Sequence, residues 1–341
     1  MSSKMPWVDI LKGIGIVFVV YGHFYSGTLR DAIFLFHMPL FFILSGYLFK
    51  PRSQLVEYAG SKASHLLVPY FSFLIIIYLV MLGHAFVNGG VSLEMAWKSI
   101  TDILLGGRAL DGDLSAFWFV TCLFLSQQMV NVLVNRLRQC WVVAILMLCV
   151  VVGYLNQYVA RAIWLPWNAN VVVIAAPFFY LGYCIRMLSY PWNGAWVQSM
   201  AWGVSVLGMI AMGLAPELMR VDMKYALYGL PLAGLLVAIA MTTILAGIAE
   251  AMAGSRTLQA LLGPLGRASM TIMFLHYPLQ GVWRSYLPTS GLIGVLGMGM
   301  SLLFPWLMHW LLNKTWLTQR LFLGSGGNRT GRSHQMPLPV A

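Results

Sequence analysis

The feature that most constrains this chain is a series of long apolar segments separated by short polar ones. The first segment is residues 7–25 (WVDILKGIGIVFVVYGHFY), and comparable runs recur through the 341 residues. A helix needs about 20 mostly apolar residues to cross the hydrocarbon core of a bilayer. Charged residues make up only 9% of the chain, whereas soluble domains carry about 25%. The sequence therefore predicts an all-α, polytopic membrane protein that lies in the lipid bilayer.

About ten transmembrane helices are predicted, and an even number places both termini on the same side of the membrane. We assign that side to the cytoplasm, because 14 of the 21 Lys and Arg residues then lie on the cytoplasmic side, as the positive-inside rule requires. The predicted segments are 7–25, 31–49, 64–82, 115–134, 140–156, 169–186, 195–214, 225–248, 268–284 and 291–313.

Outside these segments, the sequence predicts one surface helix and one tail. Residues 92–105 have apolar positions at helical spacing and predict a helix that lies on or re-enters the outer face. Residues 1–323 are expected to form one transmembrane domain, and the Gly-, Ser- and Pro-rich residues 324–341 a disordered cytoplasmic tail. The net charge of +11 is attributed to basic loops beside anionic lipid, so no nucleic acid partner is expected. No metal-ligand spacing is found, so no metal is expected.

Two ionisable residues share one face of the first segment. Lys12 and His23 are eleven positions apart, which corresponds to about three helical turns and roughly 16 Å along the axis. An ionisable side chain at membrane depth costs roughly 2.5–3.5 kcal/mol and by default marks a functional site or a buried partner. A neutral imidazole can accept a proton from a hydroxyl group. We therefore predict that His23 is a general base; the alternative is a histidine that packs between helices.

Two further histidines lie in apolar segments. His37 is about six residues into the second segment and could share a cavity with His23, or it could form a structural hydrogen bond. His276 lies within the apolar run 269–278 (SMTIMFLHYP) and could either line a site or be structural. Pro39 removes a backbone donor, so we expect the second helix to be kinked or locally opened.

Together these residues resemble the acyltransferase-3 family of integral-membrane acyltransferases, and most closely its fucose 4-O-acetylase-like branch. The specific part of the resemblance lies in the first two segments. The family more often has Arg at the position of Lys12, and Lys lacks the bidentate guanidinium fork. Weaker resemblances are residues 117–119 (FWF), 182–186 (GYCIR) and 269–278. The residues of the specific part are Trp7, Asp9, Lys12, Gly13, Ile14, His23, 36–42 (FHMPLFF) and 45–47 (SGY).

The resemblance implies an acyl-coenzyme A donor, usually acetyl-CoA, and a hydroxyl group of a carbohydrate as acceptor. The acceptor would be a cell-surface or lipid-linked polysaccharide, as in exopolysaccharide biosynthesis at the bacterial inner membrane, where association with the assembly machinery is an option. The catalytic candidates are His23, His37 and His276. The candidates for binding the phosphates of the donor are Lys12, Arg186, Arg267 and Lys62. The candidates for binding substrate are Asp9, Ser45, Trp118, Asp111 and Asp113.

Other interpretations remain open at this point. A transporter or flippase of a polyprenyl-linked saccharide would use buried histidines as proton sites. A structural scaffold would explain the composition but not the pairing of Lys12 with His23. An aromatic belt would explain Trp118, the positive-inside rule would explain Arg186, and simple solvation would explain Asp111 and Asp113. A covalent acyl-histidine intermediate and general-base catalysis are both compatible with His23.

Overall fold

The structure is a computed structural model, and it describes residues 5–88, 90, 92–189 and 191–324. Within that part, nine helical spans are long and apolar enough to cross a membrane. A tenth results if α12 (Arg256–Arg267) and α13 (Ser269–Tyr286), which are bent by 71° relative to each other, form one span. The protein is therefore an all-α polytopic membrane protein, as predicted. Apart from Gly324, the predicted tail lies outside the described residues.

Helices make up nearly all of the regular secondary structure in these ranges. The helices are α1 (Pro6–Phe24), α2 (Thr28–Phe34), α3 (His37–Tyr47), α4 (Leu55–Asn88), α5 (Leu93–Leu105), α6 (Trp118–Arg136), α7 (Gln139–Tyr158), α8 (Val172–Met187), α9 (Ala195–Leu214), α10 (Pro216–Met219), α11 (Ala233–Met252), α12 (Arg256–Arg267), α13 (Ser269–Tyr286), α14 (Gly291–Leu312) and α15 (Trp316–Phe322). Short 3-10 turns are η1 (Gly107–Ala109), η2 (Gly112–Phe117), η3 (Pro166–Asn168) and η4 (Met223–Tyr225), and the strands are β1 (Val221–Asp222) and β2 (Leu227–Tyr228).

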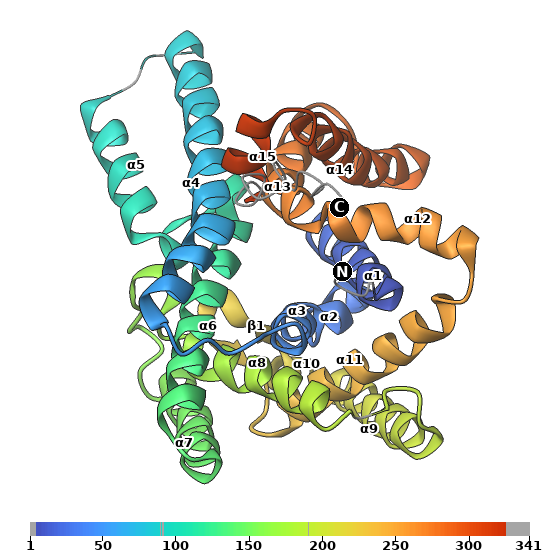
Figure 1. Ribbon diagram of the computed structural model, residues 1–341. Coiled ribbons are helices and arrows are strands. Elements are labelled where there is room, and N and C mark those ends of the chain that lie inside the picture. The colour runs from blue at the N-terminus through green and yellow to red at the C-terminus, as the bar shows by residue number, and fades with distance from the viewer. Residues whose placement is uncertain (1–4, 89, 91, 190, 325–341) are drawn as a thin grey trace, which may run out of the picture.

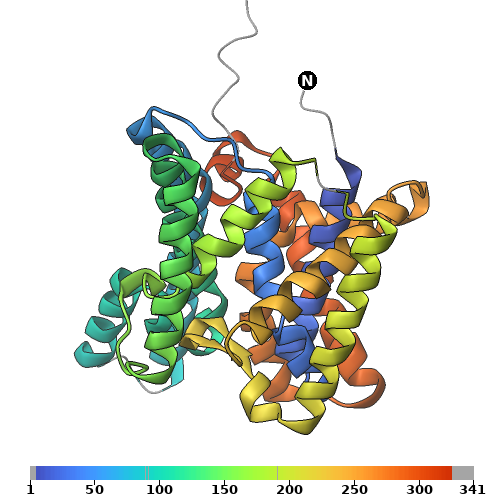
Figure 2. The same ribbon diagram turned by 90° about the horizontal axis from the view of Figure 1, so that it is seen from below.

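The first three helices lie at the centre of the bundle. Figure 1 looks along the helices and shows α1, α2 and α3 surrounded by α8, α9 and α11 on one side, α13 and α14 on another, and α4, α6 and α7 on a third. Figure 2 shows the start of α1 and helix α15 at the same end of the bundle. That placement fits the predicted even number of spans.

The second predicted helix is opened, as Pro39 suggested, but the break comes before the proline. Helix α2 ends at Phe34 and α3 begins at His37, so Leu35 and Phe36 interrupt the span. Pro39 then falls in the first turn of α3. The first four N–H groups of a helix have no partner within it, so a proline at this point costs no hydrogen bond.

Two glycines of the sequence motifs allow α3 and α8 to pack closely. A Cβ atom at Gly46 would overlap the carbonyl of Phe179, and one at Gly182 would overlap the carbonyl of Ile43. The two helices therefore approach through their backbones, as small residues permit in membrane bundles. This contact holds α3, and with it His37 and Ser45, against the rest of the bundle.

Several predicted boundaries are wrong. The third predicted helix, 64–82, is shorter than α4, because the helix continues through residues 55–63 and 83–88 despite Gly60 and Gly83. The eighth is predicted from 225, but α11 begins only at Ala233, after Pro231. Helix α12 is absent from the prediction because its charged and polar residues keep it from resembling a membrane segment. The helix predicted at 92–105 is confirmed as α5.

A short β-hairpin, residues 221–228, is a further departure from the prediction. β1 pairs antiparallel with β2, and η4 and Ala226, which has a φ of 54°, make the connection. Gln157 of α7 accepts a hydrogen bond from Tyr228 N at 2.7 Å and donates to the carbonyl of Gly229 at 3.1 Å. Asn168 Nδ2 donates to the carbonyl of Lys224 at 3.0 Å. These bonds hold the hairpin in the half of the bundle away from the start of α1 (Figure 2), and we call this half the hairpin end.

Candidate active site

A cavity of about 360 Å³ lies among α1, α3, α6, α13 and the hairpin. Lys12 and Ser45 line it from the side of Pro6, and Asp222, Lys224 and Tyr225 of the hairpin line it from the opposite side. The other linings used below are His23, Arg30, Phe34, His37, Ser115, Trp118 and Tyr277. The cavity therefore extends from Lys12 on α1 to the hairpin.

Lys12 and His23 both line this cavity, in line with their spacing on one helix. The Lys12 ammonium forms no salt bridge with any residue that the structure describes. A cation beside a cavity that forms no salt bridge is suited to an anionic ligand such as a phosphate. Lys12 thus offers a positive charge at one end, and His23 lies about 16 Å further along the same helix.

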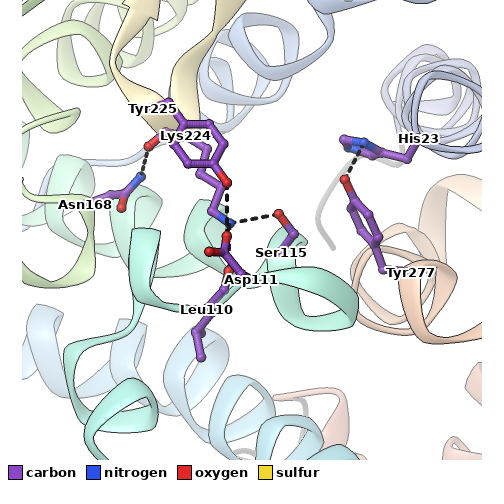
Figure 3. A network of polar contacts seen from close by, with 8 residues as sticks. All are labelled: His23, Leu110, Asp111, Ser115, Asn168, Lys224, Tyr225 and Tyr277. Atoms are coloured by element: carbon purple, nitrogen blue, oxygen red, sulfur yellow. Dashed lines mark hydrogen bonds and ion pairs between the residues drawn. The ribbon is translucent and has the colours of Figure 1, made fainter. Parts of the chain in front are cut away.

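His23 has a direct partner that sequence reasoning did not identify. Its Nδ1 lies 2.8 Å from the hydroxyl of Tyr277 on α13 (Figure 3). Arg284, also on α13, donates to the backbone carbonyls of His23 and of Phe24. The imidazole is therefore held in one orientation by a second helix. The signal in the sequence that points to Tyr277 is that it directly follows His276 in the run 269–278.

The other two histidines have the same internal hydrogen bond. His37 Nδ1 lies 3.0 Å from the carbonyl of Ile33, and His276 Nδ1 lies 3.0 Å from the carbonyl of Ile272. A carbonyl can only accept, so Nδ1 carries the hydrogen in both rings. In the neutral imidazole Nε2 is then an acceptor. Both residues therefore make the structural hydrogen bond that the sequence analysis left open. The Nε2 atom of each ring remains able to accept a proton.

The three imidazoles form a cluster around His23. The ring centroid of His23 lies 6.0 Å from that of His37 and 5.5 Å from that of His276. His37 lines the cavity, whereas His276 is fully buried and is not part of its lining. The Nε2 atom of His276 has no hydrogen-bond partner in the described part of the chain. Of the three histidines, His23 both lines the cavity and has a side-chain hydrogen-bond partner for its ring.

A buried lysine organises the hairpin end of the cavity. Lys224 is 4% exposed, and its Nζ donates to the carbonyl of Leu110 at 2.7 Å, to Asp111 Oδ1 at 2.6 Å and to Ser115 Oγ at 2.9 Å (Figure 3). Tyr225 donates to Asp111 Oδ1 at 3.0 Å. All three donors of the ammonium are used, so Lys224 fastens the hairpin to the segment before α6.

The charges around Lys224 influence one another. Burial alone would raise the pKa of Asp111, but the hydrogen bond and positive charge of Lys224 outweigh it and hold that pKa below its ordinary value. Burial lowers the pKa of Lys224, although Asp111 opposes this. Burial also raises the pKa of Asp222, against the charges of Lys224 and Arg30. Asp222 lines the cavity, so a carboxyl group faces it from the hairpin.

Among the residues proposed from the sequence, His23, His37, Lys12, Ser45 and Trp118 line the cavity. The structure places the others next to it or further away. Asp111 contacts it only through its partners Lys224 and Tyr225. The carboxylate of Asp113 lies against Gly281 of α13, where any larger residue would displace it. Arg267 forms an ion pair with Asp9 at 3.4 Å, so these two predicted residues contact each other.

The remaining donor-binding candidates make local contacts. Arg186 donates to the carbonyl of Tyr47 at 3.2 Å, and the ammonium of Lys62 lies 5.5 Å from the ring centroid of Tyr58. Neither lines the cavity. The described residues include no group of three His, Cys, Asp or Glu side chains placed to hold a metal ion.

Comparisons with known proteins give a family and partial relatives. A family model described as an acyltransferase domain, of the acyltransferase-3 type, matches residues 5–320. Nodulation protein NolL of Mesorhizobium japonicum is 32% identical over 158 residues, which cover 40% of this chain and 38% of that protein. Nodulation protein NolL of Sinorhizobium fredii is 31% identical over 132 residues, 34% of each chain. The match thus spans well under half the length of these curated relatives. No solved structure matches this chain.

Proposed function

We propose a specific reaction on the premise that this chain belongs to the acyltransferase-3 family, since the family model covers residues 5–320. The protein is a multi-pass membrane acyltransferase. Our proposal is that it moves an acetyl group from acetyl-CoA to a hydroxyl group of a carbohydrate. The observation that carries the proposal is the placement of His23 in the cavity with its Nδ1 held 2.8 Å from the Tyr277 hydroxyl.

In this mechanism, Nδ1 of His23 donates its hydrogen to the Tyr277 oxygen and Nε2 is the base. The sugar hydroxyl gives its proton to Nε2 while its oxygen attacks the carbonyl carbon of the thioester. When the C–S bond breaks, the sulfur of coenzyme A leaves and receives the proton from the imidazolium. Tyr277 does not exchange a proton with the substrates; it fixes the ring and stabilises the charge that forms on it.

We propose that the donor enters from the end of the bundle that holds Pro6, since the distribution of Lys and Arg supports a cytoplasmic position for that end. There Lys12 contributes a positive charge that no salt bridge in the described residues engages, which suits the phosphates of coenzyme A. The thin pantetheine arm would then follow the roughly 16 Å from Lys12 to His23. Arg186, Arg267 and Lys62 remain proposals for contacts with the nucleotide part of the donor.

The acceptor would enter from the hairpin end, where Asp222 and Trp118 line the cavity. A carboxylate accepts hydrogen bonds from sugar hydroxyls, and an aromatic ring can pack against the C–H face of a sugar. We propose a cell-surface or lipid-linked polysaccharide as the acceptor. The partial relatives come from rhizobia, which supports a location in the inner membrane of a bacterium.

The test is transfer of radiolabelled acetyl from acetyl-CoA to saccharide by the purified protein in detergent. We expect transfer by the wild type, and a loss of about 10²–10⁴-fold in His23→Ala, as is typical when a general base is removed. His65→Ala is the matched control, because His65 is exposed on α4 and does not line the cavity. Normal transfer by His23→Ala would refute the assignment of the base. A wild type that consumes no acetyl-CoA would favour a transporter instead.

A further inference from the structure

A second cavity, of about 230 Å³, adjoins the central one at the hairpin end. Arg30 and Phe34 of α2 line both cavities. We call the second cavity the vestibule, and its other linings are Asp31, Met212, Pro216, Glu217, Met219, Arg220 and Val221. The two cavities therefore meet at the side chains of Arg30 and Phe34.

The separation between the reacting imidazole and the vestibule is short. The ring centroids of His23 and Phe34 are 5.2 Å apart, and the guanidinium carbon of Arg30 lies 4.0 Å from the Phe34 centroid. One aromatic ring therefore stands between the base and the first charged group of the vestibule. The 5.2 Å between the His23 and Phe34 centroids is of the order of one sugar ring. The vestibule therefore lies where the neighbour of a reacting sugar would be.

The vestibule is polar but balanced in charge. Two guanidinium groups, Arg30 and Arg220, face two carboxylates, Asp31 and Glu217, and Arg30 pairs with Asp31 at 2.8 Å. Such a lining offers hydrogen-bond donors and acceptors without a net charge. A phosphate or an acidic sugar would instead require an excess of cations. The apolar remainder of the lining suits the C–H faces of a carbohydrate.

Two of the charged groups are available to a ligand. Arg220 and Glu217 are exposed, and neither forms a salt bridge with another residue in the described ranges. Their donors and acceptors are therefore not committed to holding the fold. Arg220 is also two positions from Asp222, the carboxyl group of the central cavity, so β1 links the two cavities.

We propose that the vestibule binds the sugar unit next to the one that is acetylated, so that the acceptor is a neutral oligosaccharide of at least two units. This inference rests on the proposed function, because it assumes that the acceptor is a carbohydrate. It adds that the enzyme distinguishes acceptors by their length. A single sugar would occupy only the central cavity and would forgo the contacts of Arg220 and Glu217.

The experiment compares short and long acceptors with the purified full chain and radiolabelled acetyl-CoA. The probes are methyl glycosides of fucose, glucose, galactose and N-acetylglucosamine, and neutral disaccharides that carry the same sugar at the reacting end. We expect kcat/KM to be about tenfold or more higher for the disaccharide, as one or more charge-assisted hydrogen bonds would provide. Arg220→Gln should lower this ratio about tenfold, mainly through KM of the disaccharide.

The matched control is Arg161→Gln, the same change at an exposed residue that lines neither cavity. It should keep both the ratio and the activity of the wild type. Equal kcat/KM for both lengths, or a ratio that Arg220→Gln leaves unchanged, would overturn the vestibule proposal while transfer itself still supports the proposed function. Transfer to none of these saccharides would overturn the proposed function and this inference with it. A preference for phosphorylated disaccharides over neutral ones would overturn the neutral acceptor.

Discussion

Replacing Tyr277 by Phe tests the central geometry with the loss of a single oxygen atom. The ring that remains keeps its packing against His23, whose centroid lies 4.5 Å away, while the 2.8 Å contact to Nδ1 disappears. In our mechanism this bond strengthens when the imidazole gains a proton. A hydrogen bond to a charged group contributes about 1.5–3 kcal/mol, and each 1.36 kcal/mol corresponds to tenfold in rate. We therefore expect kcat to fall about 10- to 150-fold.

The assay is the initial rate of radiolabelled acetyl transfer at varied acetyl-CoA concentration. Because Tyr277 contacts His23 and not the donor phosphates, KM for acetyl-CoA should change by less than about threefold. Tyr58→Phe is the control, since the buried Tyr58 hydroxyl has no hydrogen-bond partner among the described residues and does not line the cavity. A Tyr277→Phe enzyme with kcat within about threefold of the wild type would refute the orienting role.

Three further outcomes follow from the structure. Lys12→Ala should raise KM for acetyl-CoA about tenfold or more, Lys12→Arg should restore most of the affinity, and a Lys12→Ala enzyme with unchanged KM would exclude a phosphate contact. Gly46→Leu should destabilise the protein by about 1–3 kcal/mol or more, seen as a lower melting temperature in detergent, because the side chain would overlap the Phe179 carbonyl; an unchanged melting temperature would contradict this packing. Asp111 has a lowered pKa in the folded protein, so its stabilising effect should be present above about pH 4, the value of an unfolded Asp, and be lost as pH falls through the folded pKa. Melting curves from pH 7 to pH 3 should therefore show an acid-side loss that is smaller in Asp111→Asn, and identical profiles for the two proteins would contradict the ion pair.

The central part of the site was predictable because it depends on helical periodicity. Lys12 and His23 belong to one helix, and eleven residues of α-helix bring them to one face whatever the rest of the chain does. The same local logic predicts an opening near Pro39. These inferences require no knowledge of which helices become neighbours.

The hairpin end was not predictable because its contacts join distant segments. Lys224 bonds to Asp111 and Ser115, more than a hundred positions away in the sequence, and Tyr277 meets His23 across 254 positions. Residues 225–232 are apolar enough to predict the start of a membrane helix. Hydropathy and periodicity give no information on how a turn packs against distant parts of the chain. Contacts between distant segments therefore determine both the position of the hairpin and the partner of His23.

In the function that we propose, the hairpin contacts the acceptor, and its anchoring limits how specificity can be altered. Its shape depends on Gln157 of α7, on Asn168 before α8 and on Asp111 of the segment before α6, which accepts a hydrogen bond from the hairpin's own Lys224. Transplanting residues 221–228 from a relative with another preference would bring side chains without the three anchors that orient them. Exchange of acceptor preference between members of the family should therefore require several segments to be swapped together, and evolution along this branch should change them as a set.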